Sequence, residues 1–187
     1  MRGFYWIGFF MISLGLSGCW KSEYTKMVEQ ELATGSRNDS LFLGLHFGMT
    51  KKEFFNHCAA LNKKKLTTMG RNANVLYKIE DPIGSISMNF YPDFHNDSIY
   101  QIPVIFTYDN WTPWIRNTQP DSLQERIKRL FEQWYGEGFI SVEKDRKKNE
   151  AAFVKVDGNR QIIIFCEGEM DVKAVFTDLL VQDKIKK

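Results

Sequence analysis

The hydrophobic pattern divides this chain into three parts. An apolar leader ends at residue 18, residues 19–40 are mostly polar, and residues 41–187 show alternating and helical apolar periods. A polar stretch without an apolar period is typical of a linker, whereas repeated short periods indicate packed strands and helices. The pattern therefore predicts a flexible linker over residues 19–40 and one globular domain over residues 41–187.

The first half of the predicted domain, residues 41–109, contains a helix followed by a meander. Apolar residues alternate from Leu41 to Phe47, which predicts a strand with one buried face. Thr50 and Glu53 have the spacing of a capping box, so we expect a helix to begin directly after Thr50. The strand-like runs that follow are residues 75–80, 85–91 and 98–108.

The second half, residues 119–187, repeats this order. A helix is predicted from Pro120, because apolar residues recur at helical spacing as far as Trp134 before Gly136 ends the pattern. The strand-like runs after it are residues 139–143, 151–156, 161–167 and 172–181. We therefore predict an α+β fold with two helices packed on an antiparallel β-sheet, and a tandem helix-plus-meander repeat stays an open alternative.

The leader has the composition of an export signal. Arg2 precedes about a dozen mostly apolar residues, and the segment closes with Leu16-Ser17-Gly18-Cys19. A helix of that length spans ~20 Å, less than the ~30 Å hydrocarbon core of a bilayer. The four closing residues resemble a bacterial lipobox, which implies a signal peptide over residues 1–18 and lipidation of Cys19. The alternatives are an uncleaved short anchor and cleavage without lipid.

Removal of the leader leaves 169 of the 187 residues with a net charge of +1. This balance argues against a nucleic-acid partner, because neutralising several phosphates requires a basic stripe. The basic runs at residues 63–65 and 146–148 are interpreted as solvated turns, with anionic lipid head groups as the alternative partner. Trp20 follows the predicted lipid-bearing Cys19, whereas an enteric lipoprotein kept in the inner membrane carries aspartate at this position. By this sorting rule we expect the anchored protein in the outer membrane of the cell envelope.

Two cysteines remain if Cys19 carries the anchor. Cys58 lies on the apolar stripe of the first predicted helix, and Cys166 alternates with isoleucines on a predicted strand. Both side chains are expected to point toward the core. In an oxidising compartment they either form a disulfide or pack as buried thiols, and the sequence leaves both alternatives open.

Few residues suggest chemistry. Asp93, His95 and Asp97 would share a face of a regular strand and could hold a divalent cation, but the neighbouring turn residues favour a hairpin loop. The chain contains no nucleophile-elbow, zinc-protease, phosphate-loop or dinucleotide motif. We therefore expect a protein that is not an enzyme and has neither a cofactor nor a metal site.

The aromatic segment between the two halves is the main candidate contact site. Tyr108, Trp111 and Trp114 lie beside polar residues and Pro113, between a predicted strand and a predicted helix. Such side chains combine a large contact area with directional hydrogen bonds, as protein hot spots and sugar sites require. The alternatives are a patch for a protein partner, a glycan site, and tryptophans that pack over the core.

The run Leu45 to Phe54, with Gly48-Met49-Thr50 at its centre, resembles the helix start of small barrel-assembly accessory lipoproteins. It is also similar to domains of the β-lactamase-inhibitor-protein type. The resemblance implies a helix-on-sheet fold that binds proteins across a sheet face without catalysis. We therefore expect an envelope-anchored lipoprotein with a protein partner; the alternatives are a glycan-binding lipoprotein using Trp111 and Trp114, and a structural envelope component.

Overall fold

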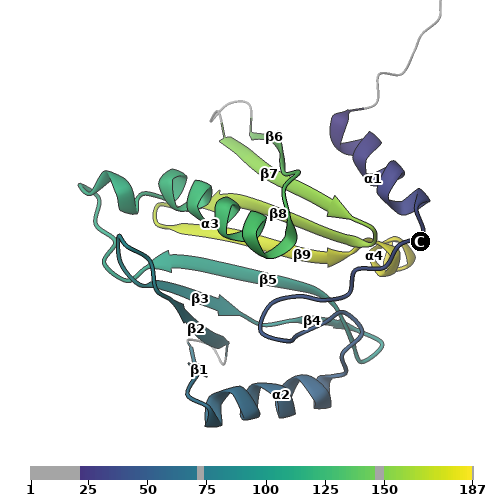
Figure 1. Ribbon diagram of the computed structural model, residues 1–187, viewed down its shortest axis with the longest axis horizontal. Coiled ribbons are helices and arrows are strands. Elements are labelled where there is room, and N and C mark those ends of the chain that lie inside the picture. Colours follow the sequence, from purple (N-terminus) through teal and green to yellow (C-terminus); the bar gives the residue numbers. More distant parts are fainter. Residues whose placement is uncertain (1–21, 71–73, 146–149, 187) are drawn as a thin grey trace, which may run out of the picture.

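The computed structural model describes residues 22–70, 74–145 and 150–186, and it contains one nine-stranded antiparallel sheet (Figure 1). The predicted α+β class is confirmed. The helices are α1 (Glu23–Ala33), α2 (Lys51–Lys63), the 3₁₀ helix η2 (Arg116–Thr118), α3 (Pro120–Tyr135) and α4 (Leu179–Ile185). The strands are β1 (Thr67–Met69), β2 (Val75–Ile79), β3 (Ile86–Phe90), β4 (Asp93–His95), β5 (Ser98–Tyr108), β6 (Ile140–Asp145), β7 (Glu150–Asp157), β8 (Arg160–Glu167) and β9 (Asp171–Asp178).

The strand order is symmetric about the middle of the sheet. It runs β1-β2-β3-β5-β9-β8-β7-β6, with the short β4 paired to β5 outside this path. Helix α2 precedes the meander that ends in β5, and α3 precedes the meander that ends in β9. These two last strands pair with each other, Ile102 opposite Phe176. The predicted order of helix and meander in each half is therefore present in the connectivity.

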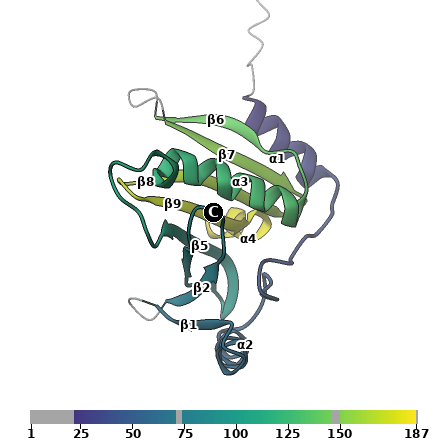
Figure 2. The same cartoon turned by 60° about the vertical axis from the view of Figure 1, so that its left-hand side comes forward.

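The main core lies between α3 and one face of the sheet. Leu123, Ile127 and Phe131 of α3 are at most 1% exposed, as expected for residues four apart on a buried stripe. The sheet contributes alternate residues of its central strands, among them Phe106 and Phe176. The helix ends at Gly136, as predicted. Figure 2 shows α3 lying across the central strands of the second half.

The prediction of a strand at residues 41–47 is wrong. Leu43 and Gly44 both have positive φ, 53° and 77°, and the chain turns back so that the Leu41 N–H donates to the Leu45 carbonyl. The segment is a loop that buries Phe42 and Leu45 in the main core. The apolar residues of this segment therefore contact the core from a tight turn, with Phe42 and Leu45 buried and Leu41 and Leu43 partly buried, and not from one face of an extended strand.

The prediction of a flexible linker over residues 19–40 is wrong for its described part, residues 22–40. Helix α1 begins at the N-cap Ser22, and its partly buried apolar side chains face a second core formed by Val154, Val156 and Leu179. Val154 pairs with Ile163, so these two side chains lie on the same face of the sheet. The neighbours of Ile163 on β8, Ile162 and Ile164, belong to the main core that α3 covers. Because side chains alternate along a strand, α1 lies on the face opposite α3. The apolar residues of α1 packed there are Tyr24, Met27, Val28 and Leu32.

The polar segment after α1 is held by side-chain hydrogen bonds. The Asn38 N–H donates to Asn159 Oδ1 at 2.7 Å, and Asn38 Nδ2 donates to Asp157 Oδ1 at 2.6 Å. Arg37 forms an ion pair with Asp178 at 3.1 Å. Asn159 and Asp178 are 0% and 1% exposed, so the polar segment completes a buried hydrogen-bond network. The domain therefore includes the segment expected to be a tether.

Candidate functional site

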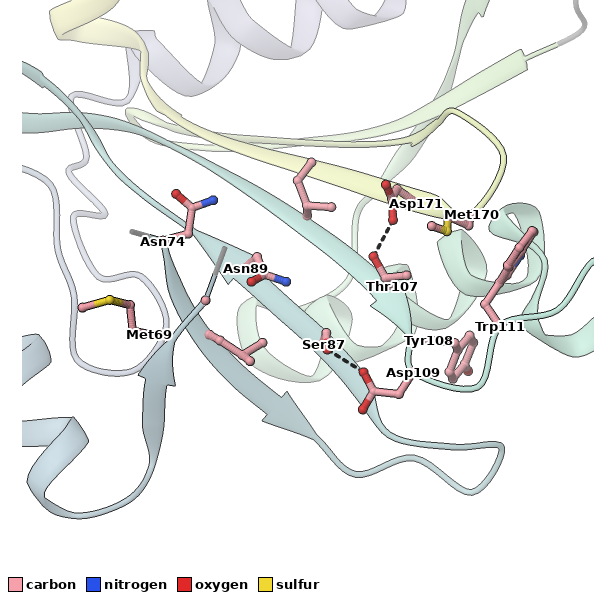
Figure 3. Close-up of a pocket in the computed structure, with 13 residues that line it drawn as sticks. Met69, Asn74, Ser87, Asn89, Thr107, Tyr108, Asp109, Trp111, Met170 and Asp171 are labelled. Atoms are coloured by element: carbon pink, nitrogen blue, oxygen red, sulfur yellow. Dashed lines mark hydrogen bonds between the residues drawn. The ribbon is translucent and has the colours of Figure 1, made fainter. Parts of the chain in front are cut away.

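The sheet face opposite α3 carries a groove of about 920 Å³. Its floor is made by alternate residues of adjacent strands, and the register places Asn89 opposite Ile105 and Thr107 opposite Asp171. These residues alternate with the core side chains of the same strands, so they point away from α3. Figure 3 shows Ser87, Asn89, Thr107 and Asp171 along this floor.

Methionine and aromatic side chains stand at the two ends of the groove. Met69, 79% exposed, lies at one end; Met170, 38% exposed, and Trp111 lie at the other (Figure 3). Methionine is flexible and polarizable, so it adapts to different contact shapes. The groove therefore combines a polar and apolar floor with adaptable apolar ends.

Lys78, Ser87 and Asp109 form a hydrogen-bonded cluster at the edge of the groove. Lys78 Nζ donates to Asp109 Oδ2 at 2.5 Å, and Ser87 Oγ donates to Asp109 Oδ1 at 2.5 Å. Partial burial raises the pKa of Asp109, but the hydrogen bonds from Lys78 and Ser87 outweigh it and hold that pKa below its usual value. A carboxylate with a lowered pKa is a weak base, so the cluster orders the groove edge without activating Ser87.

The three aromatic residues singled out by the sequence occupy different environments. Tyr108 is 2% exposed and donates through its hydroxyl to Asp81. Trp111 packs partly against the main core and forms one wall of the groove. Trp114 is 82% exposed and is not among the lining residues. The structure therefore brings Tyr108 and Trp111 to the groove and leaves Trp114 outside it.

The residues of the groove floor were not predicted from the sequence. Leu76, Asn89 and Ile105 belong to correctly predicted strands, but the sequence pattern assigned no role to the face on which they lie. The signal in the sequence was that Leu76 and Ile105 fall among polar residues on the same face of these strands. Apolar residues on an uncovered sheet face are typical of contact surfaces.

Asp81 connects the first half of the sheet to α3. Arg126 of α3 contacts Asp81 through Nε at 2.6 Å and through a terminal nitrogen at 2.8 Å, while Tyr108 and the Ile83 N–H donate to the same carboxylate. Burial raises the pKa of Asp81. The hydrogen bond from Arg126 and then that from Ile83 lower this pKa by more, so it lies below its ordinary value. The ion pair is thus a fixed contact between the two halves.

We expect Asp81→Asn to lower the free energy of unfolding by about 1–3 kcal/mol at pH 7, because Arg126 loses its charged partner. The folded-state pKa of Asp81 is lowered, so its contribution is present above the unfolded pKa of about 4 and is lost as the pH falls through the folded value. Urea unfolding at pH 7 and at pH 3 measures both effects.

The control for Asp81→Asn is Asp121→Asn. Asp121 pairs with Arg116 at 2.6 Å, but these side chains are 56% and 74% exposed, so solvent screens the pair and we expect little change. Two results would contradict the role given to Asp81. One is an equal loss of unfolding free energy in the two variants, and the other is a difference between them at pH 7 that is just as large at pH 3.

No disulfide joins Cys58 and Cys166 in the structure, which contains the packed-thiol alternative. Cys58 lies on α2 in the first half of the domain, and Cys166 lies on β8 in the second half. Cys166 Sγ contacts Gln124 Oε1 at 3.3 Å. Burial raises the pKa of the Cys58 thiol to about 11. The two residues pack as small apolar side chains, and the raised pKa makes Cys58 a poor nucleophile.

We expect both Cys58 and Cys166 to be alkylated by iodoacetamide when the protein is denatured without a reducing agent. In the folded protein at pH 8, Cys58 is expected to react at least ~100-fold more slowly than a free thiol, because burial keeps it protonated. Mass spectrometry of the labelled peptides measures both rates. A sample reduced before denaturation is the control, and alkylation seen only in that sample would show that the thiols are bonded.

The turn that the sequence favoured is present only at Asn96 and Asp97, because residues 93–95 form strand β4. Asn96 and Asp97 have φ values of 48° and 60° and connect β4 to β5 as a two-residue hairpin loop. Asp93 accepts from Gln101, and the His95 ring contacts the Asn96 side chain. Within the part of the chain that the structure describes, no three His, Cys, Asp or Glu side chains are grouped for a metal ion.

Comparisons with models of known families, with curated proteins and with solved structures found no match to this chain. Cys19 and the predicted signal peptide lie outside the described residues. In the described segments between residues 22 and 186, no helix has the length and apolar character needed to cross a membrane.

Proposed function

We propose that this protein is an envelope-anchored lipoprotein, without enzymatic activity, that binds a protein partner in the groove on the sheet face opposite α3. The observation that carries the proposal is the groove itself, with a floor made by residues from four strands. The lipobox at Leu16 to Cys19 supports the anchor and the compartment. The outer membrane is the location we propose.

The side chains of the groove suit a protein interface. Leu76 and Ile105 offer apolar contact, while Asn89 and Thr107 offer hydrogen-bonding groups between them. The groove volume, about 920 Å³, lies at the upper end of the range for small-molecule sites, so side chains of a partner protein can enter it. Aromatic and methionine side chains at its ends are the types enriched at protein interfaces.

Lipidation of Cys19 would hold the domain close to the bilayer. Helix α1 begins at Glu23, and four residues span at most about 14 Å. Because α1 packs on the sheet, the anchor would fix one side of the domain toward the membrane. Intact mass measurement of the membrane fraction tests this: we expect an acylated N-terminal Cys19, and an unmodified Cys19 would contradict the anchor.

Photo-crosslinking in cells tests the groove. A photoactivatable residue at position 89 on the groove floor should give a specific protein adduct, whereas the same residue at Arg129, exposed on α3, should not. Both positions tolerate a larger side chain, since neither is fully buried. Identical adducts from both positions, or no protein adduct from position 89, would contradict the proposal.

A glycan-binding lipoprotein is the second candidate, and one observation favours it. Trp111 and Asp109 both line the groove, and an aromatic ring together with a carboxylate suits a sugar ring. Added envelope glycan should then quench the tryptophan fluorescence of the protein. This quenching should be lost in Trp111→Leu and kept in Trp114→Leu, because Trp114 lies outside the groove. Absence of both a protein adduct and glycan quenching would leave a structural envelope component.

A further inference from the structure

The end of the molecule formed by α2 and β1 carries a concentrated positive charge. Residues 51–65 contain five lysines and one glutamate, a net charge of +4, whereas the whole chain has a net charge of +2. Lys63, Lys64 and Lys65 follow one another at the C-terminal end of α2, and all three are exposed. The rest of the chain therefore carries a net negative charge, and this end attracts acidic groups.

Large apolar side chains are exposed beside these lysines. Phe55 is 52% exposed, Leu66 49% and Met69 79%. A second groove, of about 210 Å³, lies between α2 and the β1–β2 hairpin and is separate from the floor of the large groove. Its apolar lining includes Phe54, Phe55, Cys58, Val75 and Tyr91. Apolar side chains gathered on a surface indicate contact with another molecule.

Strand β1 is the end strand of the sheet. It pairs with β2, Thr68 opposite Leu76, and in the described part of the chain no further strand lies beyond it. The backbone N–H and C=O groups on the outer edge of an end strand can pair with an added strand. The 210 Å³ groove, which includes all three residues of β1 in its lining, lies beside this edge.

We propose that the α2–β1 end binds an extended acidic segment of a partner protein as an added strand along β1. Alternate apolar side chains of the segment fill the groove between α2 and β1, and its carboxylates face Lys63, Lys64 and Lys65. Met69 and Asn74 line both grooves, but the site does not use the floor of the large groove, and it goes beyond the function proposed above. The preference for a protein segment over a lipid surface rests on the anchor at Cys19.

The positions of the two ends of the molecule favour a peptide over the membrane. In Figures 1 and 2, α2 and the start of α1 lie at opposite ends of the molecule. An anchor at Cys19 would hold the bilayer next to α1, so α2 would point away from that bilayer. A second copy of this chain is also disfavoured, because pairing β1 with β1 would bring two basic ends together.

The test measures binding of a fluorescent peptide of about ten residues, alternating glutamate and valine, to the full-length protein in neutral detergent. We expect binding that weakens as salt rises, because charge pairs contribute to it. The same peptide with glutamine in place of glutamate should bind about tenfold more weakly. Equal binding of both peptides would overturn the proposal.

Two variants locate the site. Lys64→Glu with Lys65→Glu should weaken binding about tenfold, whereas Lys184→Glu with Lys186→Glu, an equal charge change on the exposed end of α4, should change it less than about twofold. Phe55→Ser, at an exposed position, should weaken binding without loss of fold. Equal affinity of the two double variants would overturn the proposal.

Amide hydrogen exchange shows where the peptide lies. Bound peptide should protect residues 66–70, which include β1, while β3 and β5 stay unchanged. Protection on β3 and β5 instead, or binding to phosphatidylglycerol vesicles without binding to the peptide, would overturn the strand-addition site. The crosslinking experiment at position 89 reports on the large groove, so the failure of one proposal is distinguishable from the failure of the other.

Discussion

Replacing Phe176 with alanine is expected to lower the free energy of unfolding by about 3–5 kcal/mol, the largest effect that we expect from a single substitution. Phe176 is 0% exposed and lies on β9, between Ile102 of β5 and Ile162 of β8. Its ring centroid lies 5.3 Å from that of Phe42 and 5.3 Å from that of Phe131. The substitution therefore removes contacts with the loop, with α3 and with both neighbouring strands.

Urea unfolding followed by circular dichroism measures this loss. Phe55→Ala is the matched control, because it deletes the same atoms from a side chain that is 52% exposed, and we expect a change below about 1 kcal/mol. A loss below about 1 kcal/mol for Phe176→Ala as well would mean that β9 and α3 do not share one core. A lower slope of the unfolding free energy against urea would indicate a change in the compactness of the folded or unfolded state.

The parts of this core that sequence analysis predicted are those with strong local signals. Thr50 and Glu53 form the expected capping box, with both hydrogen bonds present, and α2 begins at Lys51. Helix α3 keeps the apolar face expected from residues four apart, including Leu123 and Ile127. Such signals depend on side chains within one or two turns, so they are readable without knowledge of the fold.

The parts that were missed depend on contacts between distant residues. In α1 no residue is fully buried, and its stability comes from the second core around Val154 and Val156, more than a hundred residues away. The loop containing Phe42 and Leu45 shows the same alternation as a strand, and only the left-handed turn at Leu43 and Gly44 separates the two. Apolar period alone does not distinguish these cases.

The groove was missed for a related reason. Strands β3 and β5 were predicted correctly, but which face α3 would cover, and how far α1 would extend over the other, are properties of the assembled sheet. The same mixture of Asn89 and Ile105 side by side is compatible with a solvated face and with a binding face. The arrangement of α1 and α3 on opposite faces leaves the groove open, and this open groove is the basis of the binding role proposed above.

The second large effect is expected for Gly158→Ala, in the β7–β8 turn that holds the N-terminal segment. Gly158 has a φ of +58°, and a Cβ there would lie 2.5 Å from the Ser36 carbonyl oxygen. A left-handed conformation costs alanine about 1–2 kcal/mol, and Ser36 must also move. The Gly158 N–H donates to Glu31 of α1 at 3.0 Å, so a shift of the turn would also disturb its contact with that helix.

We therefore expect Gly158→Ala to lower the free energy of unfolding by about 2–4 kcal/mol and to release residues 34–40 from the hairpin. Limited proteolysis should then cleave this segment faster than in the unmodified protein, since released backbone is accessible to proteases. The network lost includes the hydrogen bond from the Asn38 N–H to Asn159. Urea unfolding measures the change in stability.

Gly168→Ala separates the two causes of this effect. Gly168 has a similar φ of +72°, but a Cβ at this position would have no atom within 4 Å, so only the conformational cost applies. We expect a loss of about 1–2 kcal/mol and unchanged proteolysis of residues 34–40. If both variants lose equal stability and neither exposes residues 34–40, the segment is not held at Gly158.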